Sequence, residues 1–188
     1  QSGTGKTGAF VIGALQTIVE DLKELQILIL APTHELAIQT HNVVKNLSHY
    51  MKIESLLLVG GTSVEKNKKD IKEKKPQIIV GTPGRVHDMM RRRYLKVDKI
   101  TMIILDEADE MLGRGFKDQM YKIFTFMPNE VQIGLFSATL SNEVLELADS
   151  FMKSPTKILV TADQLTLQGI AQYYINLMDD VQKYETVK

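Results

Sequence analysis

The stretch Thr101-Met102-Ile103-Ile104-Leu105-Asp106-Glu107-Ala108-Asp109 decides the fold of this chain, because a continuous apolar run ends abruptly in acidic residues. A short apolar run of this kind is typical of a strand that is covered on both faces, as in a parallel sheet. In such sheets ligands bind beyond the carboxyl ends of the strands. The sequence therefore predicts a buried strand whose acidic C-terminal neighbours belong to a binding site.

Similar apolar runs recur along the chain and alternate with stretches of helical period. The predicted strands are Ile27–Ala31, Ser55–Val59, Gln77–Val80, Thr101–Leu105, Gln132–Phe136, Lys157–Val160 and Gln172–Leu177. The predicted helices are Thr7–Leu25, His34–Tyr50, Val64–Lys74, Gly84–Arg92, Phe116–Phe126 and Ser141–Met152. This alternation predicts the α/β class, with a mostly parallel sheet, right-handed crossovers and helices on both faces.

Composition excludes several classes of function. The chain has 188 residues, 44% of them hydrophobic, and its 23 Lys plus Arg balance 23 Asp plus Glu, which is the profile of an ordinary globular protein. The absence of cysteine excludes a disulfide scaffold, a zinc ribbon and thiol catalysis. A net charge of zero argues against nucleic-acid binding through a strong overall electrostatic field, but it does not exclude local sites that bind phosphate.

The first seven residues carry most of a phosphate-binding loop, whose pattern ends in Gly-Lys-Ser/Thr. They are Gln1, Ser2, Gly3, Thr4, Gly5, Lys6 and Thr7. Glycines let backbone N–H groups turn toward phosphate oxygens, and the helix that follows adds its positive end. Lys6 is expected to reach the β- and γ-phosphates of a nucleotide, and the Thr7 hydroxyl to coordinate Mg²⁺. The first residue of the pattern and its strand are expected upstream of Gln1. The simpler alternative is a Gly-rich turn that a helix caps.

The acids after Leu105 suit the other half of such a site. Asp106 at the strand end would hold Mg²⁺, and Glu107 beside it can orient or deprotonate an attacking water. Taken alone, this acidic cluster also fits a solvated helix N-terminus, where carboxylates interact favourably with the helix dipole. Its pairing with Gly5-Lys6-Thr7 favours the nucleotide site.

Together these segments resemble the first RecA-like domain of the DEAD-box ATP-dependent RNA helicases. Asp106-Glu107-Ala108-Asp109 spells the motif that names the family, and Gln1–Thr7 matches its nucleotide loop. Ser137-Ala138-Thr139 matches the family segment that links nucleotide state to RNA through hydrogen bonds with the acidic motif, here Asp109. The resemblance implies ATP and Mg²⁺ as ligands. The catalytic residues that it implies are Lys6, Asp106, Glu107, Ser137 and Thr139.

The same resemblance implies an RNA path along the strand ends. The matching residues are Pro32, Thr33, Gly60, Gly61, Thr82, Pro83, Gly84, Arg85, Arg114, Gly115 and Phe116. Backbone amides, threonine hydroxyls and one guanidinium can hold successive phosphates without touching a base, which predicts sequence-tolerant, salt-sensitive binding of RNA single strands and short duplexes. Taken singly, Gly60-Gly61 and Thr82-Pro83-Gly84 are explained more simply as turns.

One residue departs from the family pattern. His34 stands where the family has Arg in Pro-Thr-Arg-Glu-Leu-Ala. A histidine reaches less far than an arginine and is mostly neutral at pH 7, so a phosphate contact made by that arginine is expected to be weaker here.

Within the family, Val80–Val86, Leu105–Leu112 and Leu165–Leu167 are most similar to the branch that acts in translation initiation. A nuclear branch of the exon-junction type is nearly as similar. The first branch implies RNA unwinding in the cytoplasm with scaffold proteins of translation initiation. The second implies an ATP-gated RNA clamp in nuclear RNA processing, with exon-junction scaffolds. A metabolic P-loop kinase is disfavoured, because the acidic tetrad and Ser137-Ala138-Thr139 have no role in it.

The resemblance also divides the chain into parts. Residues 1–160 are expected to form the ATP-binding domain without its first strand, residues 161–169 an interdomain linker, and residues 170–188 the start of a second helicase domain. The lysine-rich run Glu65–Lys75 is interleaved with acids, so it is expected to be a solvated helix face.

Overall fold

The computed structural model describes residues 5–139, 141–159, 173–177 and 179–187. Contacts divide the chain into two units, Ser2–Thr156 and a smaller one that takes in Lys157–Lys188. The larger unit carries the sheet and all but one of the described helices. The smaller unit contributes helix α8 (Asp180–Val187).

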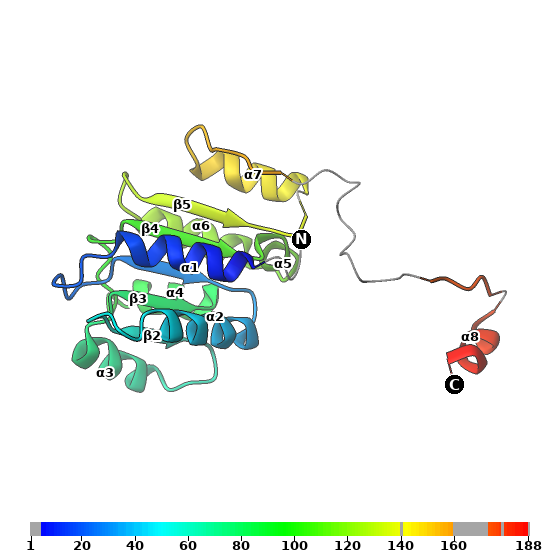
Figure 1. Ribbon diagram of the computed structural model, residues 1–188, viewed down its shortest axis with the longest axis horizontal. Coiled ribbons are helices and arrows are strands. Elements are labelled where there is room, and N and C mark those ends of the chain that lie inside the picture. Colours follow the sequence, from blue (N-terminus) through cyan, green and yellow to red (C-terminus); the bar gives the residue numbers. More distant parts are fainter. Residues whose placement is uncertain (1–4, 140, 160–172, 178, 188) are drawn as a thin grey trace. The chain divides into compact units, whose positions relative to one another are not determined.

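Five strands form one parallel sheet in the order β2-β3-β1-β4-β5 (Figure 1). The strands are β1 (Ile27–Leu30), β2 (Ser55–Leu58), β3 (Ile78–Gly81), β4 (Met102–Asp106) and β5 (Gln132–Phe136). The central strand β1 pairs with β3 and β4, and all four of its residues are buried. Because all five strands run in the same direction, their carboxyl ends lie at one edge of the sheet. The predicted α/β class is confirmed.

Side chains alternate between the two faces of the sheet, and each face has its own apolar core. Ile27 and Ile29 pack in one core with α1 (Lys6–Thr17) and α2 (His34–Leu47). Leu28 and Leu30 pack in the other. The helices on that second face are α3 (Val64–Lys74), α4 (Pro83–Arg91), α5 (Ala108–Gly113), α6 (Lys117–Phe126) and α7 (Asn142–Phe151). Helices therefore cover both faces, as predicted.

Hydroxyl side chains begin several helices immediately after strand ends. The Thr33 hydroxyl accepts the backbone N–H of Leu36 at 3.1 Å, and Ser63 and Ser141 cap α3 and α7 in the same way. Each cap satisfies a backbone donor that the first helical turn leaves free. The chain can consequently turn from strand to helix within a few residues.

Helix α1 ends earlier than predicted, at Thr17 instead of Leu25, because Gln26 captures the backbone beyond it. The buried Gln26 amide accepts from the Val19 N–H at 2.9 Å and donates to the carbonyls of Val19 and Leu22, each at 2.9 Å. A side chain that bonds the backbone in this way competes with helical hydrogen bonds. Apolar periodicity does not reveal such a contact.

The two predicted C-terminal strands are wrong within the described residues. Lys157–Leu159 and Tyr173–Leu177 form no strand, and the described strands all lie in the larger unit. Ile158 is 92% exposed and Tyr173 is 91% exposed, so neither run packs against a core. Apolar composition makes a strand only where a partner strand accepts its hydrogen bonds. Val160, Gln172 and the predicted linker, residues 161–169, lie outside the described residues.

None of the helices in the described part of the chain is both long and apolar enough to cross a membrane.

The close approach of β3 to β2 gives a test of this packing. A methyl group at Gly81 would lie 2.4 Å from the Leu58 carbonyl oxygen and 2.7 Å from Val86 Cγ2. The Leu58 carbonyl is held by the Thr82 N–H and cannot readily move aside, so we expect Gly81→Ala to lower the free energy of unfolding by about 1–3 kcal/mol in urea titrations.

Gly13→Ala is the matched control, because nothing lies within 4 Å of its added methyl on the exposed side of α1. It should raise the free energy of unfolding by about 0.5–1 kcal/mol. Equal effects of the two substitutions would contradict the packing described here.

Candidate functional site

The predicted site residues gather in two groups along the carboxyl edge of the sheet. One group surrounds the ends of β4 and β5 together with the start of α1. The other follows the ends of β1, β3 and β2, which are neighbours in the sheet. Predicted site residues as far apart in the sequence as Lys6 and Thr139 thus lie on one edge of the sheet.

Helix α1 begins at Lys6, directly after Gly5. Gly5 has φ 84°, a left-handed conformation that glycine adopts without steric cost. Lys6 and Thr7 lie in the first turn, where the free N–H groups and the helix dipole favour an anion. Gln1, Ser2, Gly3 and Thr4, the other predicted loop residues, lie outside the described residues.

Asp106 is the last residue of β4 and is only 2% exposed. Burial raises the pKa of its carboxyl above the ordinary value, and the charge of Lys6 and the backbone N–H of Glu107 oppose that rise. Lys6 is therefore close enough to Asp106 to stabilise its ionised form. A buried carboxylate beside a helix start that carries a threonine hydroxyl provides the oxygen ligands that Mg²⁺ prefers. Asp106 and Thr7 therefore fit the predicted metal.

The carboxyl of Glu107 interacts with that of Glu110. A hydrogen bond to Glu110, burial and the nearby acids raise the pKa of Glu107 to about 7. The same hydrogen bond and those from Arg114 lower the pKa of Glu110, which Arg114 holds at 2.9 Å through Nε and 2.7 Å through Nη2. Glu107 also adopts a left-handed backbone conformation, with φ 52°, which is uncommon for a non-glycine residue. A carboxyl that titrates near neutral pH can act as a general base.

Asp109 joins the end of β4 to the end of β5. Its Oδ2 accepts the Thr139 hydroxyl at 2.7 Å and the Thr139 N–H at 3.1 Å, while its own N–H donates to Ser137 Oγ at 3.3 Å. Partial burial raises the pKa of Asp109, but hydrogen bonds from Thr139 and Ser137 outweigh it, so the pKa lies below the ordinary value. The hydrogen bonds predicted between Asp109 and the Ser137–Thr139 segment are thus present.

The second group forms a row across three neighbouring strands. Ala31 N–H donates to the Gly81 carbonyl at 3.0 Å, and Thr82 N–H donates to the Leu58 carbonyl at 3.0 Å. These bonds place the segments that follow β1, β3 and β2 side by side. The predicted RNA residues Pro32, Thr33, Thr82, Pro83, Gly84, Gly60 and Gly61 therefore form one continuous series. Gly61, with φ 76°, turns the chain away from β2.

Arg85 is already engaged within this row. Its Nη2 donates to the Thr62 carbonyl at 2.8 Å, and its Nη1 donates to the Thr62 hydroxyl and to Asn67 Oδ1. Asn67 is 3% exposed, although it belongs to the lysine-rich helix α3. The guanidinium is consequently held in one orientation at the end of β2.

His34 lies against the end of β2. A methyl group at Gly60 would meet its Nε2 at 3.0 Å, so the ring occupies the space beside this glycine. The departure from the family pattern thus sits within the row. Arg114 ends α5 and binds Glu110, Gly115 has φ 78°, and Phe116 packs half-buried on the second core. Of these three residues, Arg114 is linked to Glu107 through Glu110.

The sequence did not identify three residues that shape the site: Thr62, Asn67 and Glu110. A signal for Asn67 exists, because Val64, Asn67 and Ile71 recur at helical spacing in a run of charged residues. That spacing places an amide on the inward face of α3. Helix α5 was also missed, since its six residues are too few to show a helical period.

The chain matches the DEAD/DEAH box helicase family over residues 1–147. It belongs to this family. It is 53% identical over 185 residues to the ATP-dependent RNA helicase eIF4A of Kluyveromyces lactis, covering 98% of this chain and 46% of that protein. It is 51% identical over 187 residues to the eIF4A of Neurospora crassa, covering 100% of this chain and 47% of that protein. The chain thus spans about half the length of these relatives.

Solved structures of DEAD-box proteins show the same fold. S. cerevisiae Dbp5 bound to RNA and ADP BeF3 superposes with a TM-score of 0.88 at 37% identity, covering 100% of this chain and 47% of that one. A DEAD box protein from Methanococcus jannaschii gives 0.78 at 36% identity, covering 82% of this chain and 42% of that one. The RecA-like assignment is therefore confirmed for this DEAD-box chain.

The effect of Glu110 on the pKa of Glu107 can be tested directly. Glu110→Gln removes the negative acceptor that raises the pKa of Glu107, so this pKa should fall from about 7 toward that of an ordinary glutamate. The measurement is an NMR titration of the side-chain carboxyl carbon without nucleotide or Mg²⁺. Glu146→Gln, which removes an exposed carboxylate paired with Lys117, should leave it unchanged. A Glu107 that still titrates near pH 7 in Glu110→Gln would show that burial and the charges of Asp106 and Asp109 cause the shift without Glu110.

Proposed function

We propose that this DEAD-box chain belongs to an ATP-dependent RNA helicase of translation initiation, which hydrolyses ATP when RNA is bound and separates short duplexes. The observation that carries the proposal is the bonding of Asp109 to Ser137 and Thr139. These bonds join the acids at the end of β4 to the end of β5. The eIF4A names of the relatives support translation initiation, which takes place in the cytoplasm, with initiation scaffold proteins as partners.

The proposed ATP site divides the chemistry among the residues of the first group. The loop Gln1–Gly5 and the start of α1 hold the phosphates, and Lys6 interacts with the transferred group as a point charge. Thr7 and Asp106 would hold Mg²⁺, which stabilises the charge that develops on the phosphates. Glu107 orients the attacking water and accepts its proton. A pKa of about 7 leaves a large fraction of Glu107 ionised at neutral pH and able to do so.

The proposed RNA site uses the row at the ends of β1, β3 and β2. Thr33, Gly60 and Gly84 offer hydroxyl and backbone groups to successive phosphates, and Arg85 adds one oriented guanidinium. Such contacts read the backbone and not the bases. A zero net charge is compatible with this mode of binding, because the row is a local feature. RNA affinity should therefore fall with salt, without a strong sequence preference.

We further propose that residues 1–160 act as the ATP-binding domain, that residues 161–169 link it to a second helicase domain, and that residues 170–188 begin that domain. The support is the division of the chain into Ser2–Thr156 and a unit containing Lys157–Lys188. Alignment with about half of each relative agrees with this proposal. In it, ATP and RNA draw the two domains together.

Glu107→Gln in the full-length protein separates hydrolysis from binding. The variant keeps the size of the side chain but cannot accept a proton, so we expect ATP hydrolysis to fall by about 10²-fold or more, while ATP still binds. Lys6→Ala is the comparison variant, and it should weaken ATP binding by about 10- to 100-fold through loss of a charged hydrogen bond. Measurements of phosphate release and nucleotide titrations distinguish the two effects.

Duplex unwinding, RNA binding and RNA release by Glu107→Gln decide between a helicase of translation initiation and an ATP-gated RNA clamp. The helicase proposal predicts at most one round of strand separation for each bound ATP. If ATP-dependent RNA binding and release continue at the wild-type rate without hydrolysis, the protein is an ATP-gated RNA clamp and the helicase proposal is wrong. An unchanged hydrolysis rate would remove Glu107 from the reaction.

A further inference from the structure

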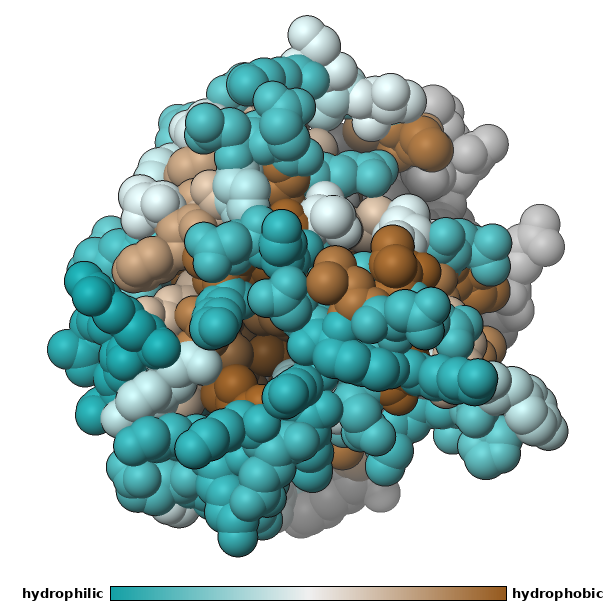
Figure 2. All heavy atoms as spheres, turned by 90° about the vertical axis from the view of Figure 1, so that its left-hand side faces the viewer, coloured by the Kyte–Doolittle hydropathy of each residue, from teal (hydrophilic) through white to brown (hydrophobic). Residues whose placement is uncertain are grey.

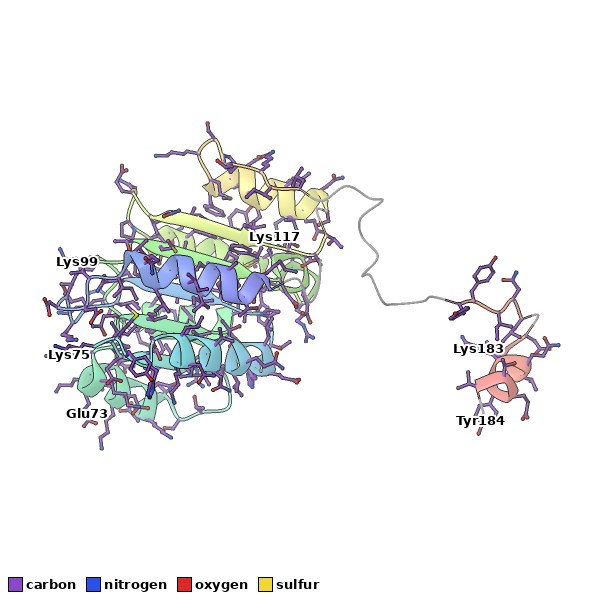
Figure 3. All side chains as sticks on the ribbon, in the orientation of Figure 1. Glu73, Lys75, Lys99, Lys117, Lys183 and Tyr184 are labelled. Carbon is purple, nitrogen blue, oxygen red and sulfur yellow. The ribbon has the colours of Figure 1, made fainter. Side chains whose placement is uncertain are left out.

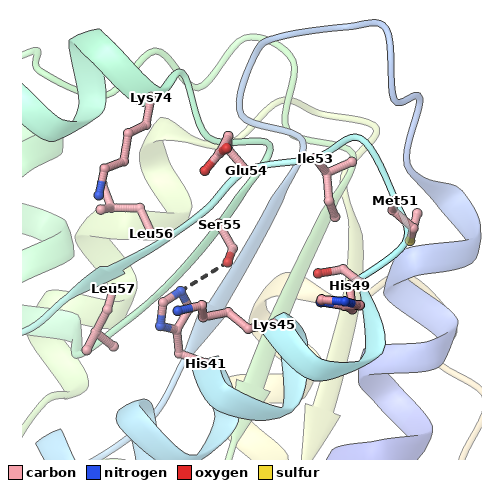
Figure 4. Close-up of a pocket in the computed structure, with 11 residues that line it drawn as sticks. His41, Lys45, His49, Met51, Ile53, Glu54, Ser55, Leu56, Leu57 and Lys74 are labelled. Atoms are coloured by element: carbon pink, nitrogen blue, oxygen red, sulfur yellow. Dashed lines mark hydrogen bonds between the residues drawn. The ribbon is translucent and has the colours of Figure 1, made fainter.

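A groove of about 440 Å³ lies at the amino end of β2, away from the strand ends that carry the proposed ATP and RNA sites. Its walls come from the C-terminal half of α2, from β2 and from the end of α3 (Figure 4). His41 and Lys45 project from α2, Ser55 and Leu57 belong to β2, and Lys74 reaches over from α3. A second groove of about 350 Å³ continues from it and shares Met51, Ile53, Glu54 and Lys74.

The combined groove is strongly basic, although the chain as a whole is neutral. Its charged and titratable lining residues are Lys23, Lys45, Lys52, Lys74, Lys75, His41 and His49, with Glu54 as the single carboxylate. Lys75 lies at the C-terminal end of α3 (Figure 3). Among the residues that the structure describes, the side chains of Lys45, Lys52 and Lys75 have no hydrogen-bond or ion-pair partner. Lys74 is paired with Asp70 at 3.8 Å, and the Lys23 ammonium donates to the Lys52 carbonyl, so the uncompensated positive charge of the groove comes from Lys45, Lys52 and Lys75.

Apolar side chains interrupt this charge. Met51, Ile53 and Leu57 line the groove and are only partly buried in the core beneath α2. Figure 2 views the side of the molecule that carries the amino ends of the strands, where apolar side chains show in a hollow among hydrophilic ones. A ligand here would meet both cations and apolar surface.

The backbone of β2 is unpaired on this side. Within the described part of the chain, β2 is an edge strand whose one partner strand is β3. The carbonyls of Glu54 and Leu58 accept from β3 or the residues that flank it, so by alternation the N–H and C=O of Leu57 point outward. Neither group has a partner in the described part of the chain. Ser55 lies on the same outer edge, two residues before Leu57. There His41 partly covers the edge, and its Nε2 lies 3.0 Å from the Ser55 hydroxyl.

We propose that this groove binds an acidic, partly apolar segment of a partner protein, which pairs in extended conformation with the outer edge of β2. Carboxylates of the segment lie near Lys45 and Lys74, its apolar side chains contact Met51 and Ile53, and its backbone bonds to Leu57. Backbone pairing along an edge supplies affinity, and side-chain pockets supply specificity. A polyanion such as RNA satisfies the lysines, but it lacks the strand-like alternation of donors and acceptors that the edge of β2 offers.

The test uses the full-length protein and a fluorescein-labelled peptide of alternating glutamate and valine, with fluorescence anisotropy as the readout. Lys45→Glu with Lys74→Glu should weaken peptide binding by about tenfold or more, because two attractive charges become repulsive. Lys122→Glu with Lys153→Glu is the matched control, since it makes the same charge change at exposed positions outside the groove, and it should bind as the wild type does. Equal losses in both double variants would overturn the proposal.

Strand pairing has its own readouts. The same peptide with N-methylated alternate amides keeps its charges but loses backbone donors, so it should bind at least tenfold more weakly. The amide of Leu57 should exchange more slowly with D₂O when the unmodified peptide is bound. Undiminished binding of the methylated peptide, or unchanged Leu57 exchange, would contradict pairing. Binding of oligo(U) that competes with the peptide and is lost in Lys45→Glu with Lys74→Glu would assign the groove to RNA instead.

Discussion

The burial of β1 and β4 on both faces is the constraint on which the rest of the structure depends. Every residue of these two strands is buried, so polar chemistry can begin only where the strands end. Since the five strands are parallel, those ends share one edge of the sheet. Asp106 illustrates the result, because it is the last residue of a buried strand and keeps a carboxylate at the boundary between core and solvent.

Three acids within four positions serve different purposes because their surroundings differ. Asp106 is desolvated and close to Lys6, which suits a ligand for a cation beside phosphates. Glu110, burial and the nearby acids raise the pKa of Glu107 to about 7, which suits proton transfer. The pKa of Asp109 lies below its ordinary value because Thr139 donates hydrogen bonds to its carboxylate and Ser137 lies beside it, which suits a link between the ends of β4 and β5. Sequence alone shows three carboxylates, and the structure assigns each its environment.

The sequence was sufficient to predict the features that follow from the pattern of apolar residues and motifs. Apolar runs located all five strands of the sheet within about one residue, and the motif residues after them fall on its carboxyl edge. It was insufficient where a single side chain or a missing partner decides the outcome. Gln26 ends α1 early through side-chain bonds to the backbone of Val19 and Leu22, and Asn67 orients Arg85 from a neighbouring helix. Ile158 remains exposed because no described strand pairs with it. Each of these depends on which partner a single side chain or strand finds in the folded chain, and apolar periodicity does not reveal that.

The link between Asp109 and Thr139 is the central claim of this account, and a double-mutant cycle tests it most directly. The measurement is RNA affinity of the full-length protein with and without a non-hydrolysable ATP analogue, for Asp109→Asn, Thr139→Val and the two combined. We predict that each single variant reduces the gain in RNA affinity caused by nucleotide, and that the double variant loses little more than one of them, a coupling of about 0.5–3 kcal/mol. Strictly additive losses, or an undiminished gain in either single variant, would contradict the claim that this hydrogen bond connects the two sites.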